Sequence, residues 1–354
     1  MKDSELYLKH EKLTQEIFNA KNMLPSRYVL VLTNLCNLRC SFCFQEKKYS
    51  KNNLNATEWI DIIKQFPEYS RVTLTGGEPL VFEGFKDIFH EVASRFDCNI
   101  ISNGMLLTKE LIDFLLSYKN FKTLSISIDT IGNINRGVTS EEWSTLKDML
   151  KYFIQRRDKL NKNCKLDIKT TVLDENTNEL YAVHKYCLEE LNADFHSFQL
   201  LKGSPIQHAD IEYNYPDIFK GYQAHSYKNF NIIKEQFDLV RDYNIKKNKI
   251  GFVHPKVTSL VEKDDTNYDF INDTFHDSNK FELCKAAWSS LHINYDGKVF
   301  PCLAVSMGNL KENKLKEIVF DSKFNQFKKD IEKHKTLPAC NRCGWLKPVI
   351  KCIK

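Results

Sequence analysis

The sequence lacks any long apolar run and any dense cluster of basic residues. None of its 354 residues lies in an apolar stretch approaching the about eighteen residues that a membrane span needs. The N-terminus is charged and amphipathic, unlike a signal peptide. The formal net charge is +5 and the lysines are dispersed, which argues against a nucleic-acid partner. We therefore expect a cytoplasmic protein with neither a membrane nor a nucleic acid as its partner.

The cysteines do not follow a disulfide pattern. The chain has 11 of them, an odd number at uneven spacings, and 354 residues can bury a core without covalent staples. Thiols stay reduced in the cytoplasm, where iron-sulfur clusters also survive. Grouped cysteines in this chain are therefore candidate ligands.

Three cysteines lie together at Cys36, Cys40 and Cys43, directly after the apolar, strand-like stretch from Tyr28 to Leu32. On one short loop, three thiolates can hold three corners of a cubane iron-sulfur cluster and leave the fourth iron without a protein ligand. Zinc is the alternative, but a zinc site usually takes four ligands from paired C-x2-C knuckles. The unequal gaps between these cysteines favour the cluster.

This C-x3-C-x2-C run, with the aromatic Phe42 just before its last cysteine, resembles the signature of the radical S-adenosylmethionine (SAM) enzymes. The resemblance implies that the open iron of a 4Fe-4S cluster chelates the amino and carboxylate groups of SAM. It also implies a one-electron donor such as flavodoxin or ferredoxin. Reductive cleavage of SAM would then give a 5′-deoxyadenosyl radical that abstracts a substrate hydrogen atom.

A second motif follows the cysteine loop. The apolar stretch Val72 to Thr75 runs into Gly76, Gly77, Glu78 and Pro79. The glycines let backbone approach a ligand closely, and turn carbonyls with a carboxylate are acceptors for a positive amino group. An ordinary glycine turn is the alternative for this segment alone. Together with the cysteine loop it resembles the GGEP motif of the family, which holds the SAM amino group.

The middle of the chain alternates short apolar runs with longer segments of helical periodicity, the order of a parallel α/β domain. The predicted strands are Tyr28 to Thr33, Val72 to Thr75, Asn99 to Ser102, Thr123 to Ile128, Leu166 to Leu173 and His196 to Leu201. The predicted helices are Ala56 to Gln65, Phe85 to Arg95, Lys109 to Tyr118, Ser140 to Arg156 and Glu179 to Leu191. A capping box of Thr139 and Glu142 begins the fourth helix. Six strand–helix units predict a partial (β/α)6, TIM-like barrel, which is also the core fold of the family.

Chemistry in barrels of this kind lies at the C-terminal ends of the strands. The polar residues predicted there are Ser102, Asn103, Ser127, Asp129, Arg136 and Gln199. Ser102 and Asn103 resemble the family segment that contacts the SAM ribose. An Arg fork suits a carboxylate, and the resemblance implies that Ser127, Asp129 and Arg136 contact the SAM carboxylate or ribose. For each candidate the alternative is a hydrogen-bonded turn or loop residue.

A second cysteine group lies near the C-terminus. It brackets a hairpin-like stretch in which Asp296 and Gly297 are a strong turn signal. Four soft ligands could bind zinc or a fully ligated cluster, and spacing alone does not decide between them. The four cysteines are Cys284, Cys302, Cys340 and Cys343.

Together with the N-terminal motifs, this segment resembles the SPASM/twitch extension of radical SAM enzymes, including its Gly-Asn element at Gly308 and Asn309. A full SPASM domain carries more cysteines, whereas four complete one cluster. The resemblance therefore implies one auxiliary 4Fe-4S cluster in a twitch-like domain. Leu303 stands where sulfatase-maturing relatives have an aspartate, which argues against that activity.

The expected domain organisation has four parts. Residues 1–26 form a helical lead-in, with its helix from about Glu5 to Phe18, and residues 27–205 form the core barrel. Residues 206–282 are a polar, aromatic-rich connection with one amphipathic helix, Phe230 to Asn248. Residues 283–354 form the auxiliary-cluster domain. The lead-in is too short for the peptide-recognition domain that many peptide-modifying relatives carry.

The resemblance implies an oxidoreductase or maturase. We expect it to oxidise or cross-link a side chain of a ribosomal peptide or protein, with the auxiliary cluster as electron acceptor. The alternative substrate is a sugar or aminocyclitol, which would be dehydrogenated or epimerised. A different class of protein, a non-catalytic zinc or redox-sensing cysteine protein, would leave the segment from Gly76 to Pro79 unexplained.

Four cysteines are left over by these assignments: Cys98, Cys164, Cys187 and Cys352. An epimerase needs a hydrogen donor for the substrate radical, and a thiol is suited to that role. The first three fit better as small buried hydrophobic residues, so only Cys352 is a candidate donor. We therefore predict oxidation.

Overall fold

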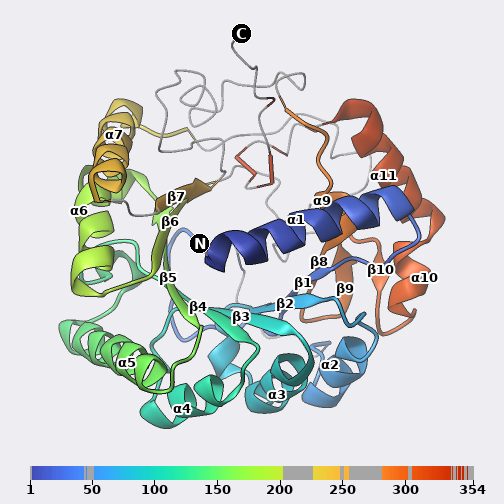
Figure 1. Ribbon diagram of the computed structural model, residues 1–354, viewed down its shortest axis with the longest axis horizontal. Coiled ribbons are helices and arrows are strands. Elements are labelled where there is room, and N and C mark those ends of the chain that lie inside the picture. The colour runs from blue at the N-terminus through green and yellow to red at the C-terminus, as the bar shows by residue number, and fades with distance from the viewer. Residues whose placement is uncertain are drawn as a thin grey trace.

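The computed structural model describes residues 2–43, 45, 52–201, 226–247, 251–254, 281–301, 305–335, 337, 340, 342, 343, 345, 346 and 349. Within them, one ten-stranded sheet has the order β10-β9-β8-β1-β2-β3-β4-β5-β6-β7. Its strands curve into an incomplete ring, and α2 to α6 lie outside that ring (Figure 1).

The strands are β1 (Arg27–Val31), β2 (Arg71–Thr75), β3 (Asp97–Ser102), β4 (Phe121–Ser127), β5 (Lys165–Val172), β6 (Phe195–Leu200), β7 (Gly251–His254), β8 (Ser290–Ile293), β9 (Lys298–Phe300) and β10 (Gly308–Asn309). The helices are α1 (Lys2–Ala20), α2 (Ala56–Ile63), α3 (Phe85–Arg95), α4 (Lys109–Ser117), α5 (Ser140–Lys159), α6 (Leu180–Lys185), α7 (Phe230–Lys247), α9 (Ala286–Ser289), α10 (Leu315–Val319) and α11 (Ser322–His334). Short 3-10 turns are η1 (Pro79–Val81), η2 (Ile134–Arg136) and η3 (Asp174–Glu179), and η4 (Tyr186–Glu190) is a π-helical turn.

Strands β1 to β6 are parallel and follow one another in chain order, with helices between them. This confirms the predicted α/β class and the partial (β/α)6 arrangement. The capping box at the start of α5 is also present, since the side chains of Thr139 and Glu142 each accept the other's backbone N–H. Local patterns in the sequence therefore located most of the barrel.

Two predictions differ from the structure. The segment predicted as one helix from Glu179 to Leu191 is divided between η3, α6 and η4. The backbone N–H of Leu191 bonds to the carbonyl of Tyr186, five residues earlier, which is the π-helical spacing. The connecting segment, predicted as helix and loop, also contributes β7, which pairs in parallel with β6.

The C-terminal hairpin extends the barrel sheet. β8 pairs in parallel with β1, and the register places Ser290 opposite Arg27. β9 then returns antiparallel to β8, and Gly297 in the predicted turn has a φ of +87°. The hairpin of β8 and β9 is thereby attached to the edge of the barrel at β1.

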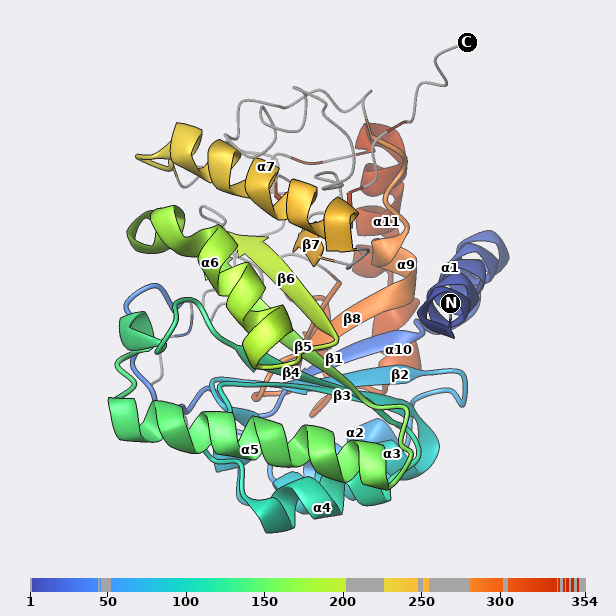
Figure 2. The ribbon, with the colours of Figure 1, turned by 60° about the vertical axis from the view of Figure 1, so that its left-hand side comes forward.

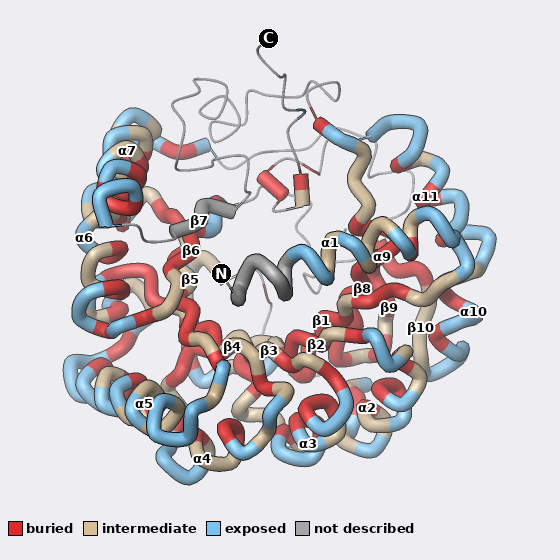
Figure 3. The backbone as a smooth tube through the Cα atoms, viewed as in Figure 1, coloured by how far each residue is buried: buried red, intermediate tan, exposed pale blue. Residues whose placement is uncertain are grey.

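The hydrophobic core lies between the sheet and the surrounding helices. Alternate residues of each strand face the helices because successive side chains point to opposite faces. Figure 3 shows the strands largely buried and the helices exposed on their outer surfaces. The strand residues that this core buries completely include Tyr28, Leu30, Leu74, Ile100, Leu124, Ile126, Leu166 and Ile168.

Helix α1 lies across the end of the barrel at which the strands begin (Figures 1 and 2). Its Gln15 accepts a hydrogen bond from Lys285 at 2.5 Å, and Phe18 packs edge-on against Trp288 of α9, with ring centroids 5.0 Å apart. The predicted lead-in helix is thus present and longer than expected. The opposite end of the barrel carries the candidate ligands.

In the described part of the chain, no helix combines the length and the apolar character that crossing a membrane requires.

Candidate functional site

The cysteine loop follows β1 at the C-terminal end of that strand. Cys36, Cys40 and Cys43 are all half-buried. Leu38 is buried in the hydrophobic core and anchors the loop between the first two cysteines. The backbone N–H of Cys43 bonds to the carbonyl of Cys40 at 3.2 Å, which closes a turn. One short, anchored loop thus presents all three thiols.

Nitrogen donors surround two of these sulfur atoms. Asn103 Nδ2 lies 3.7 Å from Cys36 Sγ, and the backbone N–H of Leu38 donates to the same sulfur at 3.4 Å. An Arg136 guanidinium nitrogen lies 3.9 Å from Cys40 Sγ. Hydrogen bonds and positive charge favour thiolates over thiols, and they stabilise the anionic sulfur ligands of a cluster. These surroundings fit the predicted cluster.

Within the described residues, no group of three or more His, Cys, Asp or Glu side chains converges on a position for a single metal ion. The assignment of Cys36, Cys40 and Cys43 to a cluster rests on their shared loop and on the donors around them. It stays a prediction.

The glycine turn after β2 packs against the start of the cysteine loop. The backbone N–H of Gly77 bonds to the carbonyl of Thr33 at 2.7 Å, and that of Glu78 bonds to the carbonyl of Leu35 at 2.8 Å. A Cβ atom on Gly77 would lie 2.3 Å from the Leu35 oxygen. The backbones of the two predicted motifs can meet this closely only because position 77 has no side chain.

Glu78 joins the ends of β2 and β3. Its side chain is fully buried. One carboxylate oxygen accepts from Ser102 Oγ at 2.8 Å and from the backbone N–H of Leu80 at 3.1 Å. The other accepts from the backbone N–H of Asn103 at 2.7 Å. Burial raises the pKa of Glu78 to about 7, although these hydrogen bonds oppose the rise.

The carboxylate of Glu78 is therefore occupied by donors of the protein itself. It orients the segment that carries Asn103, whose side chain bonds to Asn37 of the cysteine loop at 2.9 Å. Pro79 is buried and begins η1. The predicted contact between Glu78 and the SAM amino group stays a prediction.

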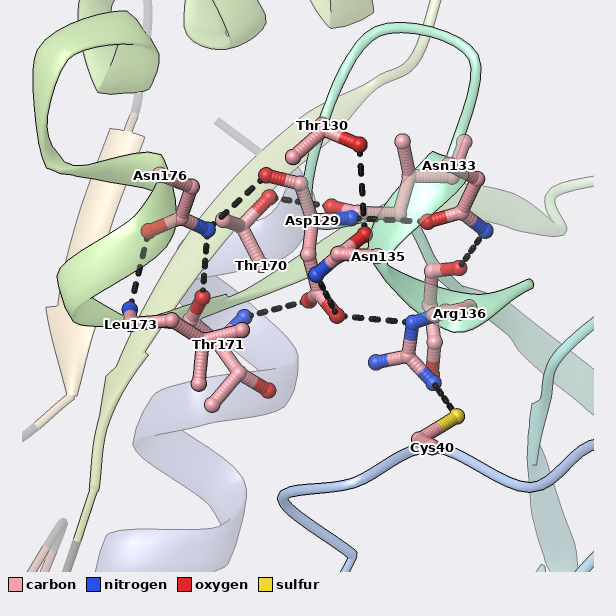
Figure 4. Close-up of polar contacts among 12 residues, drawn as sticks. Cys40, Asp129, Thr130, Asn133, Asn135, Arg136, Thr170, Thr171, Leu173 and Asn176 are labelled. Carbon is pink, nitrogen blue, oxygen red and sulfur yellow. Dashed lines mark hydrogen bonds and ion pairs between the residues drawn. The ribbon is translucent and has the colours of Figure 1, made fainter. Parts of the chain in front are cut away.

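Asp129 and Arg136 form a buried ion pair after β4 (Figure 4). Arg136 Nε lies 2.7 Å from Asp129 Oδ2, and Asp129 Oδ1 accepts from the backbone N–H of Thr171 at 2.7 Å. Burial by itself lowers the pKa of Arg136, but Asp129 and the thiols of Cys40 and Cys43 raise it above its usual value. The guanidinium is thus held as a cation beside the cysteine loop.

Arg136 also stacks on the aromatic residue of the signature. Its guanidinium carbon lies 5.3 Å from the centroid of the Phe42 ring, a cation–π distance. Asn176 joins the loop after β4 to the end of β5, because its side-chain amide donates to the backbone carbonyls of Asp129 and Thr171 at 2.9 Å each. The sequence analysis missed Asn176, since nothing in the local pattern marks it.

The variant Arg136→Lys should weaken SAM binding by about tenfold or more, because a lysine cannot pair with Asp129, approach Cys40 and stack on Phe42 together. Anaerobic equilibrium dialysis of the cluster-loaded protein measures the affinity. Arg156→Lys is the matched control, since Arg156 Nε also lies 2.7 Å from an aspartate, Asp113, on the outer surface. Equal affinity in both variants would contradict a role for Arg136 at the SAM site.

Two further candidates, Ser127 and Gln199, lie on the inner face of the sheet. Ser127 ends β4 and is half-buried, and Gln199 on β6 is exposed. Neither side chain is hydrogen-bonded to the cysteine loop in the part of the chain that the structure describes, and both stay predictions.

The second cysteine group is partly described. Cys284 is half-buried, Cys340 and Cys343 are buried, and Cys302, Leu303 and Cys352 lie outside the described residues. The backbone N–H of Cys343 bonds to the carbonyl of Cys340 at 3.0 Å, as in a C-x2-C knuckle.

Arg342 connects this knuckle to the barrel. It has a φ of +52°, and its guanidinium donates to the carbonyl of Leu201, just after β6, at 2.7 Å. The guanidinium carbon also lies 5.0 Å from the centroid of the Tyr227 ring. The Tyr227 hydroxyl in turn bonds to the backbones of Leu201 and Val172. The knuckle is therefore fixed to the C-terminal ends of β5 and β6.

The remaining described cysteines are structural. Cys98, Cys164 and Cys187 are buried, as predicted. Burial raises the pKa of the Cys164 thiol to about 12 and raises those of the other two as well. Neutral thiols of this kind are poor metal ligands.

Comparison with known proteins gives two family matches. The description "Radical SAM superfamily" matches residues 30–173. The SPASM description, "Iron-sulfur cluster-binding domain", matches residues 284–344. The two matches together cover more than half of the chain.

The chain is similar to several characterised proteins. It is 29% identical over 174 residues to the sporulation killing factor maturation protein SkfB of Bacillus subtilis. This match covers 46% of this chain and 40% of SkfB. It is 26% identical over 348 residues to the tungsten-containing aldehyde ferredoxin oxidoreductase cofactor-modifying protein of Pyrococcus furiosus, which covers 89% of this chain and 86% of that protein.

Solved structures share the fold. Streptococcus suis SuiB bound to S-adenosylmethionine superposes with a TM-score of 0.60 at 18% identity, covering 86% of this chain and 68% of SuiB. Native anSMEcpe with bound AdoMet and the Cp18Cys peptide gives 0.59 at 18% identity, covering 91% and 88%. These similarities confirm the predicted fold class.

Proposed function

Because the chain belongs to the radical SAM superfamily and carries a C-terminal SPASM domain, we propose that it oxidises or cross-links a side chain of a ribosomal peptide or protein. One arrangement carries this proposal. The C-terminal end of the barrel brings together residues that follow β1, β3 and β4, namely Cys36, Cys40, Asn103 and Arg136. Barrels of this kind perform their chemistry at that end.

The family matches establish the cofactors as SAM, a 4Fe-4S cluster and an auxiliary iron-sulfur centre. Cys36, Cys40 and Cys43 would hold the first cluster. When bound, cluster and SAM together supply a 5′-deoxyadenosyl radical. Arg136, fixed by Asp129, places a positive charge beside Cys40 that offsets the negative charge of a bound cluster. Asn103, fixed by Glu78, donates toward Cys36.

The auxiliary site supports oxidation over a redox-neutral reaction. Cys284, Cys302, Cys340 and Cys343 would complete one fully ligated 4Fe-4S cluster. The substrate would lose a hydrogen atom, which becomes part of 5′-deoxyadenosine, and then a proton to a base and an electron to the auxiliary cluster. Arg342 fixes the knuckle to the C-terminal end of the barrel, the end that also carries the cysteine loop. A flavodoxin or ferredoxin would supply the first electron.

A peptide substrate is supported by what similar proteins act on. SkfB is a maturation protein of a killing factor, SuiB has been solved with its precursor peptide SuiA, and anSMEcpe with the Cp18Cys peptide. The match covers less than half of SkfB, and the structural relatives share only the fold. The proposal that this chain modifies a peptide therefore rests on its own test.

A second candidate substrate is a small molecule. The Pyrococcus relative, which matches along most of both chains, is named for modifying a cofactor. A small-molecule substrate therefore stays the alternative, with dehydrogenation or epimerisation of a sugar or aminocyclitol as the competing reaction. A non-catalytic zinc or redox-sensing protein has no support from the family matches.

The test is to incubate the reconstituted protein anaerobically with SAM, dithionite and each short peptide encoded in its own operon. We expect a product lighter than the peptide by two hydrogen atoms and an equal amount of 5′-deoxyadenosine, measured by mass spectrometry. A product whose mass is unchanged in H2O, and which gains one solvent deuterium on carbon in D2O, would instead identify an epimerase. Cys352→Ala should then abolish this deuterium incorporation.

A further inference from the structure

The concave inner face of the sheet carries a group of polar side chains on β4, β5 and β6. Ile168 belongs to the core between the sheet and the helices, so its neighbours Asp167 and Lys169 face the other way. The strand register places Ser125 opposite Asp167 and Ser197 opposite Lys169. We call Ser125, Asp167, Lys169 and Ser197 the inner-face cluster.

Hydrogen bonds and one ion pair join these four side chains. Asp167 Oδ2 accepts from Ser125 Oγ at 2.9 Å and lies 2.7 Å from Lys169 Nζ. Ser197 Oγ donates to Asp167 Oδ1 at 3.4 Å and accepts from Lys169 Nζ at 3.3 Å. Asp167 and Ser197 thus fix the position of the Lys169 amine, and the charges of Asp167 and Lys169 offset each other.

The inner face becomes more accessible toward the C-terminal ends of the strands. Ser125 and Ser197 are each only 3% exposed. Two residues further along the same strands, on the same inner face, Ser127 is half-buried and Gln199 is exposed. The exposure of Lys169 is intermediate, since 27% of its side chain is accessible. It is therefore within reach of a molecule that enters from that end of the barrel.

Lys169 is also close in the sheet to the residues of the candidate site. It is the register partner of Ser127. Two residues later, the backbone N–H of Thr171 donates to Asp129, and Asp129 pairs with the Arg136 that reaches Cys40. A molecule bound at Lys169 would lie beside the place predicted for SAM.

The alternative role for the ion pair of Asp167 and Lys169 is purely structural, namely to fill the interior of the barrel. Buried ion pairs, however, add little stability over apolar residues of similar size. An ammonium has three N–H bonds, and two are directed at Asp167 and Ser197. The third can donate to an oxygen of a ligand.

Resting on the proposed function, we propose that Lys169 is a substrate-binding residue that donates a hydrogen bond to a carbonyl oxygen of a peptide amide. Asp167 and Ser197 are its positioning residues. Because the charge of Asp167 already offsets that of Lys169, the pair favours a neutral acceptor over a second carboxylate. The same donor could take a carboxylate oxygen, and the test separates these two sources.

The test uses two small probes with deuterium at every carbon-bound position: N-acetylalanine N-methylamide, which offers only amide carbonyls, and N-acetylalanine, which adds a free carboxylate. Each is incubated at millimolar concentration with the reconstituted full-length protein, SAM and dithionite. Mass spectrometry measures the fraction of 5′-deoxyadenosine that carries deuterium. With the amide probe, Lys169→Met should lower this fraction by about tenfold or more, the loss expected for one charge-assisted hydrogen bond.

Lys165→Met is the matched control, because Lys165 lies on the same strand, is 30% accessible and pairs with an aspartate, Asp194, at 3.5 Å. The double variant Asp167→Asn with Lys169→Met avoids an unpaired buried carboxylate and should show the same loss if Lys169→Met alone fails to fold. A larger loss with the carboxylate probe would replace the amide by a carboxylate as the recognised group. Unchanged labelling in Lys169→Met, or no labelling of either kind in the parent protein, would overturn the role of Lys169. Failure of the parent protein to cleave SAM at all would instead overturn the proposed function.

Discussion

Cys40→Ala should abolish the formation of 5′-deoxyadenosine from SAM and dithionite, lowering its rate by at least about a thousandfold. The reason is that two thiols on the loop are too few to hold a cluster that keeps one iron open for SAM. Anaerobic chromatography of the reaction measures the product. Cys36→Ala and Cys43→Ala should have the same effect, because all three residues would ligate one cluster.

Cys164→Ala is the control for this result. It also removes a thiol, but Cys164 is buried and precedes β5, at the opposite end of the barrel from the cysteine loop. Its activity should match that of the parent protein. Cleavage of SAM that survived in Cys40→Ala would refute the assignment of the loop, and S-adenosylhomocysteine as the sole product would indicate a methyltransferase.

Anaerobic reconstitution should load about eight irons per chain, two four-iron clusters held by cysteine. Replacing Cys36, Cys40 and Cys43 together by Ala should remove about half of the iron and leave the auxiliary cluster bound. Replacing Cys340 and Cys343 by Ser should remove the other half, while SAM cleavage continues without oxidation of substrate. Iron and sulfide assays with Mössbauer spectra distinguish the two losses.

Cys98→Ala with Cys187→Ala is the matched control for iron content, since both thiols are buried away from either cysteine group. This variant should bind the full amount of iron. Tightly bound zinc without iron in the parent protein would contradict the whole assignment. If the parent protein bound only four irons, and the variant without Cys36, Cys40 and Cys43 bound none, the auxiliary site would hold no cluster.

The local elements of the fold could be predicted because their signals are local. Alternation of apolar runs located β1 to β6, and the residues Thr139 and Glu142 located the start of α5. An Asp-Gly pair located the turn at Gly297. The strands that flank the six barrel strands were harder to place, since β7 and β8 are short and their pairing with β6 and β1 joins segments far apart in the sequence.

The sequence by itself determined the radical SAM family of this chain and the cofactors that come with it. Three cysteines on one loop and a glycine turn that ends in Glu78 are short-range patterns, and their meaning does not depend on what packs around them. Cys284, Cys302, Cys340 and Cys343 likewise marked a second group of soft ligands. The fold class followed from periodicity in the same way.

Only the tertiary structure decided how these residues are used. Glu78 binds Ser102 and Asn103, and Arg136 reaches Cys40 across 96 positions of sequence. The inner-face cluster likewise exists only because three parallel strands align in register. Such contacts depend on strand order and on which face a side chain takes, and both are set by burial of the whole core.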